Sequence, residues 1–182
     1  MTAAGKTAAR RGLLFLAIGL ILYGGLYAGS EALVYRHALR NRFFAVKTSA
    51  VPAYDVVILG ASHALPLDFA DTNAALERAL DMRIINLAMP GAGIIPNRLV
   101  LEYFLARHRT AAVVYVLDSF IVTSRQWNED RLADVKLLHR APFDPALARL
   151  MASYAARGLI NPVTAIHYVT GFPKINNGDR FK

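Results

Sequence analysis

Ser62 is the residue whose position could support nucleophilic chemistry. It follows directly on Gly60 and Ala61, at the end of a short apolar run rich in β-branched residues. A serine in the turn after a buried strand can present its hydroxyl to a crevice, where backbone N–H groups stabilise an oxyanion. Gly91 follows a second such run, and glycine permits the close backbone approach that an oxyanion donor needs. The alternative is that Ser62 caps the next helix or makes a local hydrogen bond.

Side chains that could act as a base or ligate a metal lie near the same predicted turns. His63 is adjacent to Ser62, and because consecutive side chains diverge we expect it to be a polar neighbour rather than the general base. His63, Asp68 and Asp118 could together hold a divalent metal, but this pattern is unspecific and their simpler roles are turn and loop caps. The Gly-x-Gly at 91–93 lacks the third glycine of a dinucleotide site. We therefore assign no metal ligand and expect no cofactor.

These residues need a sheet that brings the ends of several strands together. Three short apolar runs predict strands, at residues 54–60, 83–89 and 111–117, of which we expect the first two to be buried. Helical patterns lie between and after them, at residues 71–80, 95–108 and 144–157. This order is typical of a parallel sheet with helices on its faces, in which ligands bind beyond the carboxyl ends of the strands. From residue 161 onward, prolines and glycines predict a loop-like tail.

An apolar segment near the N-terminus predicts a membrane span. Residues 12–29 carry no charge and, as a helix, would extend about 27 Å, close to the hydrocarbon thickness of a bilayer. The span can continue to Tyr35 if Glu31 lies near the interface. Three glycines favour close packing against another membrane helix: Gly24, Gly25 and Gly29. The alternative is a signal peptide cut after Ala28 or Gly29, although its apolar region would be longer than usual.

Charge and composition exclude several classes of protein. The 182 residues include no cysteine, which rules out disulfides, thiolate metal sites and a cysteine nucleophile. The net charge is +8, of which residues 1–47 supply +6, from seven basic side chains and one acid. Because this excess flanks the apolar run, we expect no nucleic-acid binding. Basic residues stand on both sides of the span, so charge does not decide its orientation.

Three blocks of sequence resemble a known superfamily. VVILGASHALPLDF at 56–69, INLAMPGAG at 85–93 and VVYVLDSF at 113–120 are similar to the bacterial membrane-anchored branch of the SGNH/GDSL hydrolases, in particular to SGNH-like proteins associated with polysaccharide O-acetylation. The resemblance covers roughly residues 50–160. It implies a three-layer α/β sandwich with a short parallel sheet, flavodoxin-like or SGNH-like. It also implies that Ser62 is the nucleophile and Gly91 an oxyanion donor.

The chain departs from the pattern of that superfamily at three places. Ala61 stands where an aspartate is usual, and Asp118-Ser119 stands where the third block has its oxyanion asparagine. The late Asp-x-x-His that supplies the base and its orienter is absent, because none of the five histidines has an aspartate three residues before it. A serine without a base loses most of its nucleophilicity.

These observations predict a division of the chain into five parts. Residues 1–11 form a basic tail, 12–35 a transmembrane helix, 36–52 a basic juxtamembrane stalk, 53–160 the SGNH-like domain, and 161–182 a turn-rich tail. One alternative for this tail is that it is truncated. Residues 31–46 suit either a helix on anionic headgroups or a solvated stalk.

Two functions fit this organisation. The first is a non-catalytic, single-pass accessory subunit of a larger membrane protein complex, built on a degenerate SGNH-like domain. The second is a membrane-anchored serine esterase or O-acyltransferase that acts on cell-envelope polysaccharide. The expected partners are the lipid bilayer, other membrane protein subunits and, for the enzyme, a glycan. The resemblance implies the bacterial inner membrane, with the domain on the periplasmic side.

Overall fold

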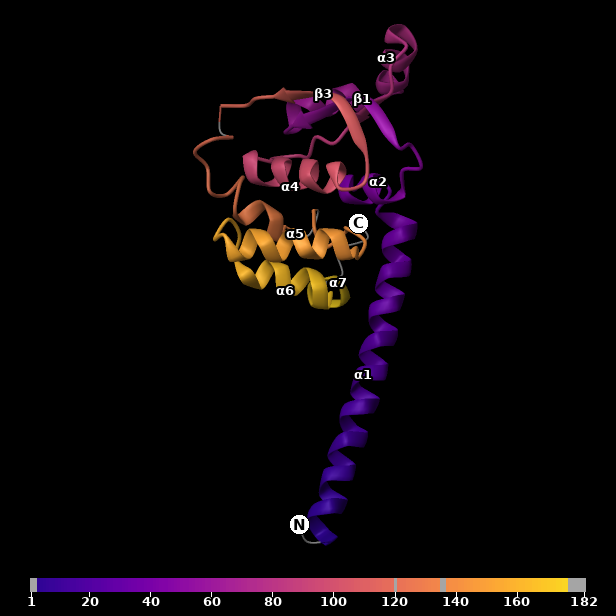
Figure 1. Ribbon diagram of the computed structural model, residues 1–182, viewed down its shortest axis with the longest axis vertical. Coiled ribbons are helices and arrows are strands. Elements are labelled where there is room, and N and C mark those ends of the chain that lie inside the picture. The colour runs from indigo at the N-terminus through magenta and orange to yellow at the C-terminus, as the bar shows by residue number, and fades with distance from the viewer. Residues whose placement is uncertain (1–2, 120, 135–136, 177–182) are drawn as a thin grey trace.

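The computed structural model describes residues 3–119, 121–134 and 137–176, and two parts dominate it (Figure 1). One is a long helix, α1 (Ala3–His37), and the other is a folded α/β domain at the carboxyl end of this helix. Within α1 the segment Gly5–His37 is long and apolar enough to cross a membrane. No residue in its most apolar stretch is buried. The mixed α/β class and the apolar N-terminal helix that the sequence predicts are confirmed.

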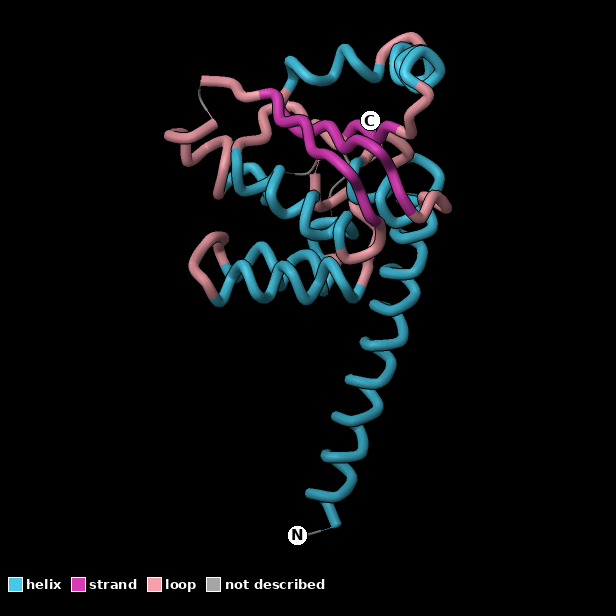
Figure 2. The backbone as a smooth tube through the Cα atoms, turned by 45° about the horizontal axis from the view of Figure 1, so that its top comes forward, coloured by secondary structure: helices cyan, strands magenta, loops and turns pink. Residues whose placement is uncertain are grey.

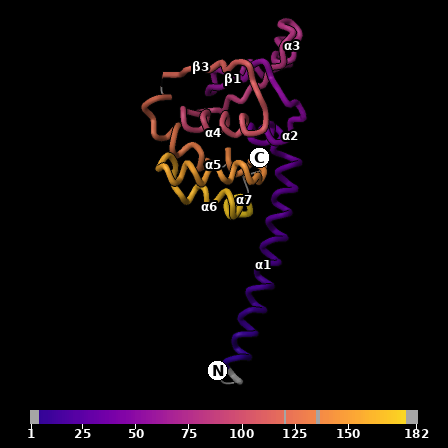
Figure 3. The backbone as a smooth tube through the Cα atoms, in the orientation of Figure 1, coloured from indigo at the N-terminus to yellow at the C-terminus, as the bar shows by residue number. Residues whose placement is uncertain are grey.

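The domain contains a small sheet and a series of short helices, whose course along the chain is traced in Figure 3. The strands are β1 (Ala53–Gly60), β2 (Ile84–Asn86) and β3 (Arg109–Val116). Two 3-10 helices are η1 (Ser62–Asp68) and η2 (Asp130–Ala133). The α-helices are α2 (Arg42–Thr48), α3 (Thr72–Leu80), α4 (Ile94–Leu105), α5 (Pro145–Ala156), α6 (Pro162–Thr170) and α7 (Phe172–Asn176).

The three strands form a parallel sheet in the order β2-β1-β3. Because side chains alternate along a strand, β1 serves two apolar clusters. Val57 and Leu59 belong to the main core, which the sheet forms with α4 and α5, as the helices below the strands in Figure 2 illustrate. Ile58 belongs to a smaller cluster with Ala64 of η1 and Ile84 of β2.

Strand β3 differs from β1 in being poorly covered. Both Val113 and Val114 are exposed although their side chains point to opposite faces, and Leu117 just beyond the strand is exposed as well. In the described part of the chain β1 is the strand neighbour of β3, and the other edge of β3 has none. An apolar strand is therefore left open along one edge.

The segment after α1 packs into the domain rather than forming a solvated stalk. Helix α2 begins after Asn41, whose side chain accepts a hydrogen bond from the Phe44 N–H at 3.1 Å. Phe43 and Val46 are fully buried in the main core. The sequence pattern of 31–46 showed basic and aromatic residues, but it could not show that Phe43 and Phe44 face inward.

The segment from residue 161 forms two helices where the sequence predicted a loop-like tail; its last residues, 177–182, lie outside the described residues. The turn-forming residues are helix caps. The Asn161 side chain accepts from the Val163 N–H at 2.9 Å and Pro162 occupies the first turn of α6. Gly171 ends α6 in the left-handed region, with φ +66°.

Helices α6 and α7 are fastened to α1. The Tyr23 hydroxyl donates to the Thr170 carbonyl at 2.7 Å. Further along α1, Glu31 forms an ion pair with Lys174, and its second carboxylate oxygen accepts from the Phe143 N–H at 2.9 Å. The domain therefore contacts α1 from about the level of Tyr23 to the carboxyl end of the helix.

Candidate functional site

The candidate site lies at the carboxyl edge of the sheet, where β1 ends at Gly60. This residue has φ +150°, and a Cβ there would lie 2.9 Å from the Val116 carbonyl oxygen, so only glycine fits. The Gly60 N–H donates to Oδ1 of Asn97 at 3.0 Å. The chain then turns into η1 and leaves Ser62 and His63 exposed.

His63 and Asp118 meet at this edge. Nδ1 of His63 contacts Oδ1 of Asp118, which brings together the ends of β1 and β3. The Asp118 side chain is mostly buried, whereas the imidazole is largely exposed. The second oxygen of Asp118 is buried and has no hydrogen-bond partner among the described residues. A carboxylate held against one imidazole nitrogen fixes the orientation of the ring and leaves its other nitrogen free to act.

Asp68 does not join this pair. Its carboxylate forms an ion pair with Arg42 at 2.7 Å, and Nε of Arg42 also donates to the Ala88 carbonyl. Among the described residues no group of three histidine, cysteine, aspartate or glutamate side chains has the arrangement of a metal site. Of the three residues considered as metal ligands in the sequence, the structure brings together two, His63 and Asp118.

Gly91 lies in a tight turn beneath an indole ring. Its φ is +63°, and a Cβ there would lie 2.7 Å from Cε3 of Trp127. The neighbouring Gly93 donates its N–H to the Trp127 carbonyl at 2.7 Å. Nε of Arg131 donates to the Pro90 carbonyl at 2.8 Å, and this hydrogen bond stabilises the same turn. The position of Trp127 gives a packing reason for glycine at residue 91.

Buried amides build the edge of the sheet, and the sequence analysis missed them. Nδ2 of Asn97 donates to the Ala92 and Gly93 carbonyls at 3.0 and 2.8 Å. Asn86 donates to the Ala64 carbonyl at 2.8 Å and accepts from the Ala88 N–H at 2.9 Å. Each amide ties one loop of this edge to another. An asparagine inside an apolar helix, as at residue 97, was the available signal for such a role.

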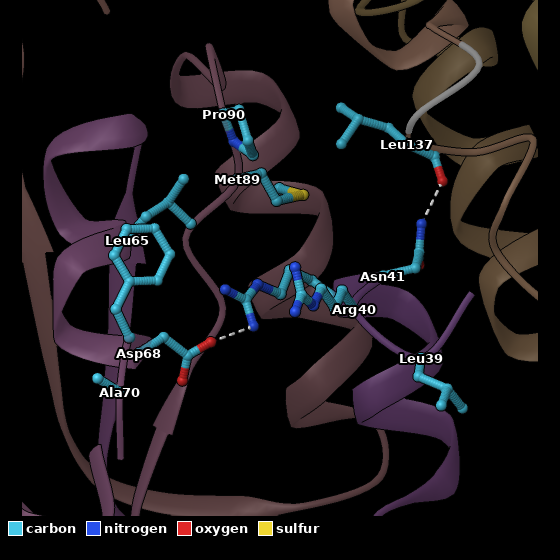
Figure 4. A pocket seen from close by; sticks show the side chains of 11 residues that line it. Leu39, Arg40, Asn41, Leu65, Asp68, Ala70, Met89, Pro90 and Leu137 are labelled. Carbon is cyan, nitrogen blue, oxygen red and sulfur yellow. Dashed lines mark hydrogen bonds and ion pairs between the residues drawn. The ribbon is translucent and has the colours of Figure 1, made fainter. Parts of the chain in front are cut away.

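A cavity lies beside this edge rather than over Ser62 (Figure 4). It measures about 590 Å³ and lies between the turn joining α1 to α2, the end of η1 and the Met89-Pro90 turn. Arg40, Arg42 and Asp68 supply its charge. Ser62, His63 and Gly91 are not among its lining residues. The cavity therefore belongs to the junction between the helix and the domain.

Comparisons of the chain with protein-family models, with curated proteins and with solved structures found no match. The resemblance to SGNH/GDSL hydrolases is therefore carried by the three sequence blocks alone. The fold and site define a class in coarse terms: a mixed α/β domain with a small parallel sheet, behind a helix able to cross a membrane.

Proposed function

We propose that the chain is a single-pass membrane protein whose domain is a non-catalytic accessory subunit of a larger membrane protein complex. The domain would be a degenerate SGNH-like, three-layer fold on the periplasmic side of a bacterial inner membrane. The smaller apolar cluster under η1 supports a third layer, since it places helical residues on the second face of the sheet.

The open strand β3 carries the proposal. Natural proteins protect an edge strand with charge, proline or a cover, because an open edge recruits other strands. From Thr110 to Leu117 the chain has no charged side chain and no proline, and both its faces expose valine. A strand of this kind is suited to contact with a second polypeptide, which would add backbone hydrogen bonds along the edge.

The membrane helix offers a second contact surface. Nothing in the described structure lies within 4 Å of a Cβ built at Gly24, Gly25 or Gly29. Gly25 and Gly29 are four residues apart, so they share one face of α1, and small residues on one face allow a second helix to approach closely. This open face supports packing against another membrane subunit.

The site itself supports a role without catalysis. The Ser62 side chain makes no hydrogen bond within the described ranges, and the indole of Trp127 covers Gly91. Together with the missing Asp-x-x-His, these features favour a Ser62 hydroxyl that is not activated for catalysis.

Site-specific photo-crosslinking tests the accessory role. A benzophenone amino acid at Val114 on β3 is expected to capture one membrane protein subunit, whereas the same probe at exposed Arg149 on α5 captures none. In mild detergent the extracted particle is expected to exceed the 20.0 kDa chain and its micelle by a fixed mass. Val114→Lys should abolish the additional mass of the particle, because a buried lysine would lie in the contact. A chain that runs alone and yields no product from Val114 would contradict the proposal.

A second candidate is a membrane-anchored serine esterase or O-acyltransferase acting on a cell-envelope glycan. The contact between His63 and Asp118 favours it, since an imidazole oriented by a carboxylate is the base of a hydrolytic triad. In this function Ser62 would attack an ester carbonyl once its proton passes to the free nitrogen of His63. The two candidates differ in one observable property, the reactivity of the Ser62 hydroxyl.

A further inference from the structure

Helix α6 presents an apolar face that nothing in the described structure covers. Val163, Ile166 and Val169 are spaced three residues apart on one side of the helix, and Phe172 follows at the start of α7. These four side chains are between 47% and 57% exposed. The opposite side of α6 buries Thr164 and Tyr168 against the domain. The helix is therefore amphipathic with its apolar side turned outward, the reverse of a helix that faces water.

This face also lacks charge. From Gly158 to Asn176 the sequence contains one lysine, Lys174, and no arginine, aspartate or glutamate. Lys174 is 2% exposed and paired with Glu31, so it adds no charge to the surface. An uncharged face with four exposed apolar side chains is typical of contact with lipid or protein.

The position of α6 decides between those two occupants. It lies beside α1, at the lower side of the domain, which faces the N-terminus of α1 (Figure 1). The hydrogen bond from Tyr23 to Thr170 fixes the end of α6 at the level of Tyr23, and Gly171 packs beneath the ring of Tyr27. The apolar face thus points along α1 toward its N-terminal, most apolar part.

The length of the span then brings α6 to the membrane. Arg11 is the last charged residue before the apolar run. A hydrocarbon core of about 30 Å needs roughly 20 residues of helix, which from Gly12 reaches Glu31. Between Gly12 and Tyr23 there are only 12 residues, or about 18 Å. A bilayer of about 30 Å that keeps Arg11 near one surface therefore extends about 12 Å beyond the level of Tyr23, so the docked end of α6 lies within its second leaflet.

We propose that α6 and Phe172 form an in-plane membrane helix, whose apolar side chains pass the headgroup–acyl boundary and enter the acyl chains of the leaflet next to the domain. The proposal rests on the membrane anchoring proposed above. Such helices bury their apolar face about 5–10 Å into this boundary. The domain then sits directly on the lipid, held by α1 and α6 together, and its orientation to the bilayer is fixed.

Depth-dependent quenching tests this contact in the full chain. Because the protein has no cysteine, single cysteines can be labelled with the fluorophore NBD at chosen positions. Ile166→Cys probes α6, Leu20→Cys probes the centre of the span, and Ala79→Cys on exposed α3 is the aqueous control. Each labelled chain is reconstituted into vesicles of phosphatidylcholine and phosphatidylglycerol that contain lipids doxyl-labelled at carbon 5 or carbon 12.

The proposal expects a blue-shifted probe at residue 166 that the doxyl lipids quench at least twofold. The probe at residue 20 should be quenched as well, more by 12-doxyl than by 5-doxyl lipid, and the probe at residue 79 should not be quenched. Quenching at residue 20 with a water-exposed probe at residue 166 would overturn the inference and leave the anchor intact. A blue-shifted but unquenched probe at 166 would also overturn it, in favour of a protein cover. No quenching at residue 20 would instead contradict the anchoring.

Val163→Cys repeats the test if the Ile166→Cys variant does not fold.

Discussion

Replacing Glu31 by alanine is expected to destabilise the domain by about 3–5 kcal/mol, because it leaves a buried charge without its partner. Lys174 is 2% exposed, and its ammonium is held by Glu31 and by the Ala141 carbonyl at 2.8 Å. Burial already lowers the pKa of Lys174, and Glu31 acts in the opposite direction. Without Glu31 the pKa falls further, and the Phe143 N–H loses its acceptor.

Chemical unfolding in mild detergent, followed by the emission of the single tryptophan, measures this loss. Glu129→Ala is the matched control, since Glu129 forms a comparable ion pair with Arg125 at 2.9 Å on the exposed surface. Its loss is expected to cost less than about 1 kcal/mol. The double variant Glu31→Gln/Lys174→Met should recover most of the stability, because no charge then remains buried. Equal losses for Glu31→Ala and Glu129→Ala would contradict the docking of α1 described here.

Gly91→Ala is expected to destabilise the domain by about 2–5 kcal/mol for two separate reasons. A non-glycine residue in the left-handed region costs about 1–2 kcal/mol. In addition, the new methyl group would lie 2.7 Å from Cε3 of Trp127 and 3.4 Å from Nε of Arg131, and overpacking of this kind costs about 1–3 kcal/mol. The main chain of Trp127 is itself held at this turn, because its carbonyl accepts from the Gly93 N–H at 2.7 Å.

Gly158 provides the matched control for this prediction. Its φ is +70°, nearly that of Gly91, but a Cβ there would meet no atom within 4 Å. Gly158→Ala should therefore cost the backbone strain alone, about 1–2 kcal/mol. In a Trp127→Ala background, with unfolding followed by circular dichroism, Gly91→Ala should cost no more than Gly158→Ala. A wild-type background in which the two substitutions cost the same would show that Trp127 does not cover Gly91.

Local sequence patterns were sufficient for the strands. The β-branched runs marked β1 and β3 closely, because a strand that is apolar on both sides leaves a continuous signal. The run at 83–89 was longer than β2, since Leu87 and Met89 still donate their N–H groups to β1 but at the edge of the regular ladder. The sequence also located Ser62, His63 and Asp118 at one edge of the sheet, and the contact between His63 and Asp118 agrees with that prediction.

The features that sequence patterns missed depend on contacts between distant residues. Glu31 and Lys174 are 143 residues apart, and nothing local shows that they form a pair. Asn161, Pro162 and Gly171 predicted a loop, because the residues that cap short helices are the same ones that form turns. A solitary tryptophan at residue 127 carries no information about the glycine beneath it. The segments involved all pack against α1 or against the turn after β2.

Labelling with a fluorophosphonate probe tests the central claim, a domain without serine catalysis, most directly. The full-length chain is extracted in mild detergent, its fold is checked by circular dichroism, and the wild type is compared with Ser62→Ala. The account expects equal background labelling of both, because Ser62 lacks an activating hydrogen bond within the described residues. Strong labelling of the wild type that disappears in Ser62→Ala would contradict it and establish the serine hydrolase.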